Sequence, residues 1–198
     1  SFAGTSFKTM EFDSMELDGF TPWTETMAKE FDRHVGYSVI RFLPLLAGWK
    51  LADHKIQEQF LYDWKKFVSD RLIESHYATG RKVLQSYGVK LIAEAGGPGP
   101  PIWDSNPVDG IKALGVVDIP RGEFWIRHRG IFLVKEIAAA AHVYDKRLVD
   151  AESFTTWRRW VDGPLNHKEL ADRALCEGLN CFSGHTFASS PPEAGLPG

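Results

Sequence analysis

Three glutamates in this sequence lie at the ends of short apolar runs. Glu16 closes MEFDSME, Glu94 lies near the end of VKLIAEA, and Glu152 lies near the end of RLVDAES. Each is followed by an irregular segment, and a helix-like pattern comes later. Carboxylates at strand ends, ahead of loops that lead into helices, are typical of (β/α) barrel active sites. Two carboxylates that flank one bond are also what glycoside hydrolysis requires.

Spacing alone leaves a purely structural role possible for the acids around Glu16 and around Glu152. Asp13 and Glu16 are three residues apart, so they converge only where a strand ends, and they could instead cap a following helix. Glu152 shares a strand face with Asp150, and it could form a salt bridge with an arginine such as Arg158.

Further side chains suit a carbohydrate or cation site. Glu94 precedes the Gly- and Pro-rich stretch 96–101, where the backbone can approach a ligand closely or simply connect two elements. Glu123 is followed by two aromatic residues, the second of them Trp125, and an indole face matches the C–H face of a sugar ring. His185, at the end of CFSGH, could bond a sugar hydroxyl or belong to the core.

Several familiar catalytic motifs are missing from the sequence. It has no G-x-S-x-G elbow, no H-E-x-x-H pair and no P-loop. Serine–histidine nucleophilic catalysis and zinc-dependent hydrolysis are therefore poorly supported. A metal would be held by oxygens of Asp and Glu, which favours calcium.

The elements that must position these residues alternate between strand and helix. That order predicts an α/β fold with parallel strands, in about five strand–helix units. A complete (β/α)8 barrel has eight units and about 250 residues, so we expect the C-terminal portion of such a barrel. An open doubly wound sheet is the alternative, and the lack of a G-x-G-x-x-G after an early strand disfavours it. The expected strands are 7–15, 37–48, 89–93, 122–126, 148–154 and 180–187, and the expected helices are 22–35, 53–87, 128–144 and 164–175.

Bulk composition fits one globular core. The chain has 198 residues, 43% of them hydrophobic, and a net charge of −3. Nothing in it suggests a nucleic-acid surface or a membrane patch, so neither partner is expected. The two cysteines, Cys176 and Cys181, could be free or paired, and we expect two buried thiols. Their spacing is not a zinc signature.

Taken in order, the motifs resemble glycoside hydrolase family 106, the α-L-rhamnosidases. The most specific parts are D-S-x-E with a downstream W-T, then E-F-W, A-E-S-F-T, and a final G-x-N…H. The resemblance runs from about Glu11 to Gly198. It implies that residues 1–198 form part of a (β/α)8 catalytic domain, truncated on its N-terminal side and lacking flanking β-rich domains.

The resemblance further implies calcium-dependent, inverting hydrolysis of terminal α-L-rhamnosyl groups, with Glu16 as general acid and Glu152 as general base. It implies a rhamnose-containing carbohydrate as substrate, a longer parent chain around this segment, and a secreted or periplasmic location. A retaining glycosidase and a non-catalytic carbohydrate-binding remnant are the alternatives. The expected substrate contacts are Asp13, Trp23, Glu94, Trp125 and His185, and the expected calcium ligands are Glu94 and Glu123.

Overall fold

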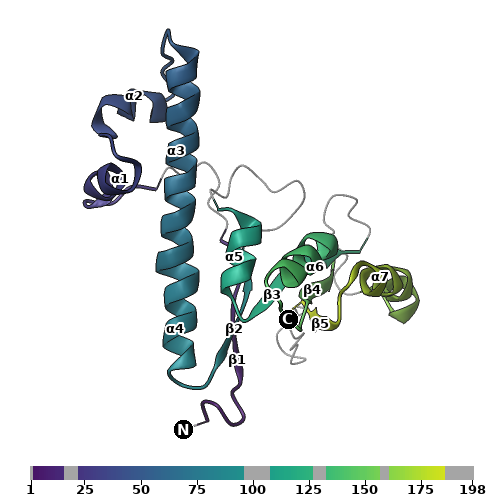
Figure 1. Ribbon diagram of the computed structural model, residues 1–198. Helices are drawn as coiled ribbons and strands as arrows, with labels where there is room; N and C mark the ends of the chain where they lie inside the picture. The colour runs from purple at the N-terminus through teal and green to yellow at the C-terminus, as the bar shows by residue number, and fades with distance from the viewer. Residues whose placement is uncertain (1, 16–21, 96–107, 127–132, 157–160, 186–198) are drawn as a thin grey trace, which may run out of the picture.

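Five parallel strands pair in the order in which they occur along the chain (Figure 1). The computed structural model describes residues 2–15, 22–95, 108–126, 133–156 and 161–185. Strand order in a doubly wound sheet reverses at a switch point, whereas strands of a barrel follow one another. Chain order therefore makes this a barrel-like, half-barrel α/β sheet and contradicts the doubly wound alternative for the described strands. The strands are β1 (Thr9–Phe12), β2 (Lys90–Glu94), β3 (Ile119–Trp125), β4 (Asp150–Thr155) and β5 (Cys181–Gly184).

One face of this sheet is apolar and covered by helices α5 (Gly110–Val116), α6 (Val134–Val143) and α7 (Pro164–Glu177). Leu91 and Ala93 of β2 belong to one buried cluster with α5, and Ala151 of β4 belongs to another with α6 and α7. Alternate strand residues point to opposite faces. The residues between these apolar positions must therefore point away from the helices.

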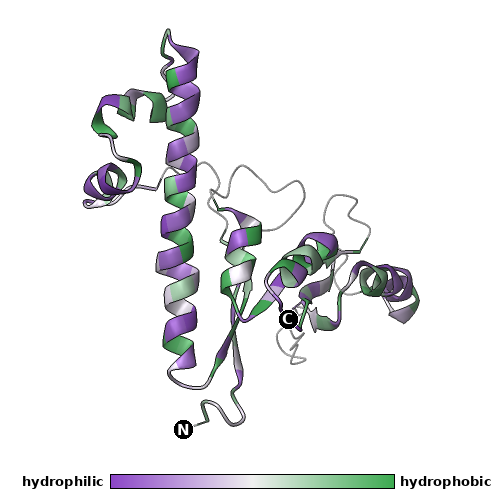
Figure 2. Ribbon diagram, in the orientation of Figure 1, coloured by the Kyte–Doolittle hydropathy of each residue, from purple (hydrophilic) through white to green (hydrophobic). Residues whose placement is uncertain are grey.

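A helical layer fills the chain between β1 and β2. Helix α3 (His54–Leu72) continues through a π-helical turn (Ile73–Ala78) into α4 (Thr79–Gln85) as one rod. Its colours in Figure 2 mix hydrophilic and hydrophobic along its length, as in an amphipathic helix. The lower part of the rod packs beside β2. Helices α1 (Met27–Val35) and α2 (Leu43–Leu46) pack on its upper part through a third buried cluster.

Local signals placed several elements correctly. The predicted helix over 53–87 is the α3–α4 rod, and the Asp53 side chain caps it by accepting hydrogen bonds from the backbone of Lys55 and Ile56. Helix α7 begins at Pro164 and ends at Gly178, whose φ of 111° suits glycine.

Other element predictions are wrong. Residues 37–48, predicted as a strand, form a 3-10 turn and α2, because a short apolar run packs as well in a helix as in a strand. Helix α1 begins at Met27 rather than Pro22, and α5 was not predicted.

Both cysteines are free thiols, but the expectation that both are buried is wrong, because Cys176 is exposed and Cys181 is only half-buried. No helix within the described part of the chain is long and apolar enough to cross a bilayer.

Candidate active site

The second face of the sheet carries the polar residues, and the strand register brings them into rows. In the strand register Glu94 of β2 lies opposite Arg121 of β3, and Arg121 lies opposite Asp150 of β4. One step further along the strands, Glu123 of β3 lies opposite Glu152 of β4. Because the strands are parallel and alternate, residues far apart in sequence meet near the carboxyl ends of neighbouring strands.

Three of these carboxylates converge. Glu94, Glu123 and Glu152 each offer an oxygen, and the three oxygens lie within 4.8 Å of one another. Glu94 is 3% exposed and Glu123 is 5% exposed. Buried carboxylates this close repel one another unless a proton or a cation intervenes. The sequence identified all three residues, and the structure brings them to one place.

Glu94 is the most constrained member of this carboxylate triad, which consists of Glu94, Glu123 and Glu152. Burial, followed by the nearby charges of Glu123 and Glu152, raises the pKa of Glu94 to about 9. Its Oε1 atom is buried and accepts no hydrogen bond from the described residues. Glu94 also approaches Glu11 and Asp13 of β1 and its exit, again with oxygens within 4.8 Å. A buried, unbonded carboxylate oxygen at the centre of an acidic cluster is what a hard cation would need.

Arg121 supplies positive charge beneath the triad. It is 6% exposed, its Nε lies 2.5 Å from Oδ2 of Asp150, and its Nη1 pairs with Glu11. Ser183 of β5 adds a hydrogen bond of 3.0 Å to Asp150. Asp150 and Glu11 are therefore compensated by this arginine, unlike Glu94.

Sequence reasoning missed Arg121 and Glu11 as members of the site. The signal for Arg121 was present, since it is two residues from Glu123 in IPRGEFW and must share its face. The signal for Glu11 was weaker, because its pairing with Arg121 depends on β3 lying beside β2, which in turn lies beside β1.

Glu152 has two polar neighbours. The hydroxyl of Thr155 donates a 2.5 Å hydrogen bond to its Oε1, and Nε2 of His185 lies 3.7 Å from the same oxygen. His185, just beyond β5, thus lies beside Glu152 of the triad. Trp125 lies opposite Thr155 in the register, at the end of β3.

Of the three remaining predicted residues, only Trp23 lies in the described part of the chain. Glu16 and Arg158 lie outside the described residues. Trp23 is 44% exposed and stacks on Trp64 of α3, with ring centroids 6.0 Å apart. It therefore belongs to the helical layer, and the structure does not bring it together with the carboxylates.

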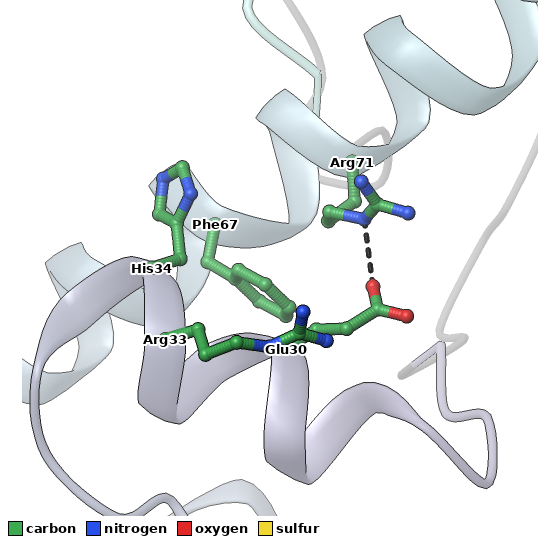
Figure 3. A pocket seen from close by; sticks show the side chains of 5 residues that line it. All are labelled: Glu30, Arg33, His34, Phe67 and Arg71. Atoms are coloured by element: carbon green, nitrogen blue, oxygen red, sulfur yellow. Dashed lines mark ion pairs between the residues drawn. The ribbon is translucent and has the colours of Figure 1, made fainter.

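A separate pocket of about 400 Å³ lies between α1 and α3, away from the triad (Figure 3). It is lined by Glu30, Arg33, His34, Phe67 and Arg71. Arg71 crosses it to pair with Glu30 at 2.9 Å, so part of its charge is already used to join the helices. The pocket contains none of the converging acids, so we assign the candidate site to the strand ends rather than to this cavity.

Comparison with known proteins identifies the family. Residues 2–198 match the sequence profile of glycoside hydrolase family 106, alpha-L-rhamnosidase. The chain belongs to this family. The resemblance inferred from the ordered motifs is therefore confirmed over nearly the whole chain.

Two known proteins are similar to this family 106 chain over most of its length. A protein of Formosa agariphila named "Putative beta-glucuronidase" is 32% identical over 189 residues, which are 95% of this chain and 16% of that protein. The solved structure of a rhamnosidase from Novosphingobium sp. PP1Y matches with a TM-score of 0.75 and 27% identity, over 91% of this chain and 17% of that one. The chain thus spans about a sixth of the length of either relative.

Proposed function

We propose that this chain contributes active-site residues to a glycoside hydrolase that removes terminal α-L-rhamnosyl groups from glycans or glycosides. The convergence of Glu94, Glu123 and Glu152 at the strand ends carries the proposal. Family membership and the solved rhamnosidase support the sugar. The cluster supports the reaction class, because glycoside hydrolysis needs paired carboxylates in a protected site.

Within this proposal Glu152 is the general base and Glu16 the general acid of an inverting reaction. Glu152 activates water: a proton passes to its carboxylate while the water oxygen bonds to the anomeric carbon. The glycosidic oxygen leaves with the proton of the general acid on the opposite side of the ring. The carboxyl separation of about 6.5–9.5 Å expected for inversion leaves room for that water. Asp13, Trp125 and His185 are proposed to contact the sugar.

Calcium is proposed as the cation of this site. Glu94 and Glu123 would hold it, since the unbonded Oε1 of Glu94 needs a partner and oxygen ligands suit calcium. Two oxygens up to 4.8 Å apart can share one ion at the usual calcium–oxygen distance of about 2.4 Å. When bound, calcium would coordinate sugar hydroxyls and orient the ring.

We further propose that this chain works within a longer polypeptide that completes a (β/α)8 barrel around it. Each relative is about six times longer than the matched segment. In the described sheet, β1 and β5 each pair with one neighbour, so both outer edges remain available to further strands. A secreted or periplasmic location stays a prediction.

The roles are tested by replacing the two glutamates in the full-length polypeptide. Glu16→Gln and Glu152→Gln should each lower kcat on an aryl α-L-rhamnoside about 100-fold or more, because an amide cannot transfer the proton. Glu169→Gln, on the exposed part of α7, is the control and should keep wild-type activity. Near wild-type turnover by either site variant would show that its assigned role is wrong, and product NMR of the first-formed anomer would test inversion.

A second substrate is favoured by one observation, the name of the Formosa agariphila relative. A glycosidase acting on β-linked glucuronides would use the same carboxylates on a different sugar. Parallel assays with aryl α-L-rhamnoside and aryl β-glucuronide separate the two. A preference of tenfold or more in kcat/KM for the glucuronide would replace the rhamnosidase assignment.

A further inference from the structure

Strand β4 contains one residue more than its neighbour β3 requires. Phe124 lies opposite Ser153, but Trp125 lies opposite Thr155, so Phe154 has no partner across the ladder. Phe154 has a φ of 66°, the left-handed region that a bulky side chain rarely adopts. This is a β-bulge, and bulges near active sites commonly redirect a side chain.

The bulge exchanges the faces of the two residues that follow Ser153. In a regular strand Phe154 would share the face of Glu152, and Thr155 would point toward the helices. Instead the Phe154 ring joins the helix side, stacked 4.5 Å from His167 of α7 and 5.9 Å from Phe182 of β5. Thr155 is turned to the carboxylate side. The aromatic contacts offset the unfavourable backbone at Phe154.

The redirected Thr155 hydroxyl bonds one particular oxygen of Glu152. It donates to Oε1 at 2.5 Å, and His185 approaches the same atom at 3.7 Å. Oε2 of Glu152 accepts no hydrogen bond from the described residues. A carboxylate fixed through one oxygen has its other oxygen held in a defined direction.

We propose that Thr155, placed by the Phe154 bulge, is a positioning residue that holds Glu152 by Oε1 and reserves Oε2 for the attacking water. The inference rests on the proposed function, since it needs Glu152 to be the base. In the reaction the water proton passes to Oε2 while the Thr155 hydrogen bond to Oε1 is kept. Thr155 itself exchanges no proton with substrate.

The test compares Thr155→Val and Thr155→Ser in the full-length polypeptide. Val removes the donor with little change in volume, so kcat should fall about 10- to 100-fold with KM within about twofold. Ser restores the hydroxyl and should recover most of kcat. Ser153→Ala, which removes a hydroxyl from the opposite face of the same strand, is the control and should leave kcat unchanged.

Each outcome of that test decides the inference. Wild-type kcat in Thr155→Val, alongside an inactive Glu152→Gln, overturns the role of Thr155 and leaves the proposed function standing. An active Glu152→Gln overturns the proposed function itself. Weakened calcium binding by Thr155→Val, measured by calorimetry, would also overturn the inference, because Thr155 would then act on the cation site.

The bulge can be tested by thermal unfolding, without an activity assay. Glycine accepts a positive φ and alanine does not, so Phe154→Gly should melt about 2–4 °C above Phe154→Ala. Phe182, on the neighbouring strand with an ordinary backbone, is the matched control, and there the glycine variant should melt below the alanine variant. If the glycine and alanine variants melted in the same order at position 154 as at position 182, the bulge at Phe154 would be overturned.

Discussion

At the scale of single residues, Glu94 shows most directly what the site demands. It is nearly fully buried, surrounded by Glu123, Glu152 and Asp13, and its Oε1 has no hydrogen-bond donor among the described residues. Arg121 does not relieve it, because its ion pairs are with Asp150 and Glu11. At neutral pH Glu94 therefore holds a proton that relieves this repulsion, and a bound cation would take the place of that proton.

Glu94→Gln should separate the cost of burying this carboxyl among other acids from the gain of binding a cation. Without calcium, the wild-type carboxyl must take up a proton when the chain folds at pH 7, whereas the Gln amide carries no charge, so the free energy of unfolding of the variant should rise by about 1 kcal/mol. Saturating calcium should stabilise the wild type by about 2–3 kcal/mol at 100 times its Kd, and the variant by much less. Thermal unfolding with calcium and with chelator measures both.

Glu58→Gln on the exposed side of α3 is the control for this substitution, and it should respond to calcium as the wild type does. Equal calcium stabilisation of Glu94→Gln and wild type would contradict the assignment of Glu94 as a ligand.

At the scale of elements, the strands hold the site because their other face fits closely against the helices. Gly122 of β3 lies under α6, where an added Cβ would overlap the Ile137 side chain and lie 3.2 Å from Cβ of Leu133. Glu123 is the next residue, on the site face. Close approach of α6 to β3 therefore fixes the depth at which Glu123 enters the triad.

Gly122→Ala should lower the free energy of unfolding by about 1–3 kcal/mol, because Ile137 is buried and cannot move aside without further repacking. Denaturant unfolding measures the change. Gly184→Ala in β5 is the matched control, since an added Cβ there meets nothing within 4 Å. A loss at Gly184 as large as that at Gly122 would show that backbone flexibility, rather than overlap with Ile137, is the cause.

Periodicity predicted the elements that have strong local signals. The α3–α4 rod carries an apolar stripe and an Asp53 cap, and α7 lies between Pro164 and Gly178, so their sequences specify helices by themselves. Residues 37–48 carry an apolar run without such signals. Their helical form depends on packing Val39 and Leu45 into the cluster between α1 and α3.

At the scale of the whole molecule, a small set of polar contacts ties the helical layer to the sheet. The carboxylate of Asp70 in α3 forms ion pairs with Lys112 of α5 at 2.5 Å and with Lys66 at 2.7 Å. Nε2 of His34 in α1 lies 3.3 Å from the same carboxylate. Burial alone raises the pKa of Asp70, but the hydrogen bonds and charges of Lys112 and Lys66 outweigh it, and the pKa lies below its ordinary value.

Asp70→Asn should lower the free energy of unfolding by about 1 kcal/mol at pH 7. A carboxyl with a lowered folded pKa contributes stability above its unfolded pKa and loses it as the pH falls through the folded pKa. The difference between wild type and variant should therefore shrink below about pH 4. Urea unfolding at a series of pH values measures it.

Asp172→Asn, in an exposed pair with Lys168 on α7, is the control and should show little effect at any pH. A difference between wild type and Asp70→Asn that stays constant from pH 7 to pH 3 would contradict the ion-pair explanation.

The sequence by itself determined the class of fold, the family and three of the converging carboxylates, because alternation and strand-end positions are local properties of the chain. Ordered motifs such as A-E-S-F-T then carried the resemblance that the family match confirmed. Only the tertiary structure decided which residues share a row across strands. Strand pairing placed Arg121 beneath the triad, and one unpaired residue, Phe154, turned Thr155 onto Glu152. Both depend on register between segments distant in sequence, which no local pattern encodes.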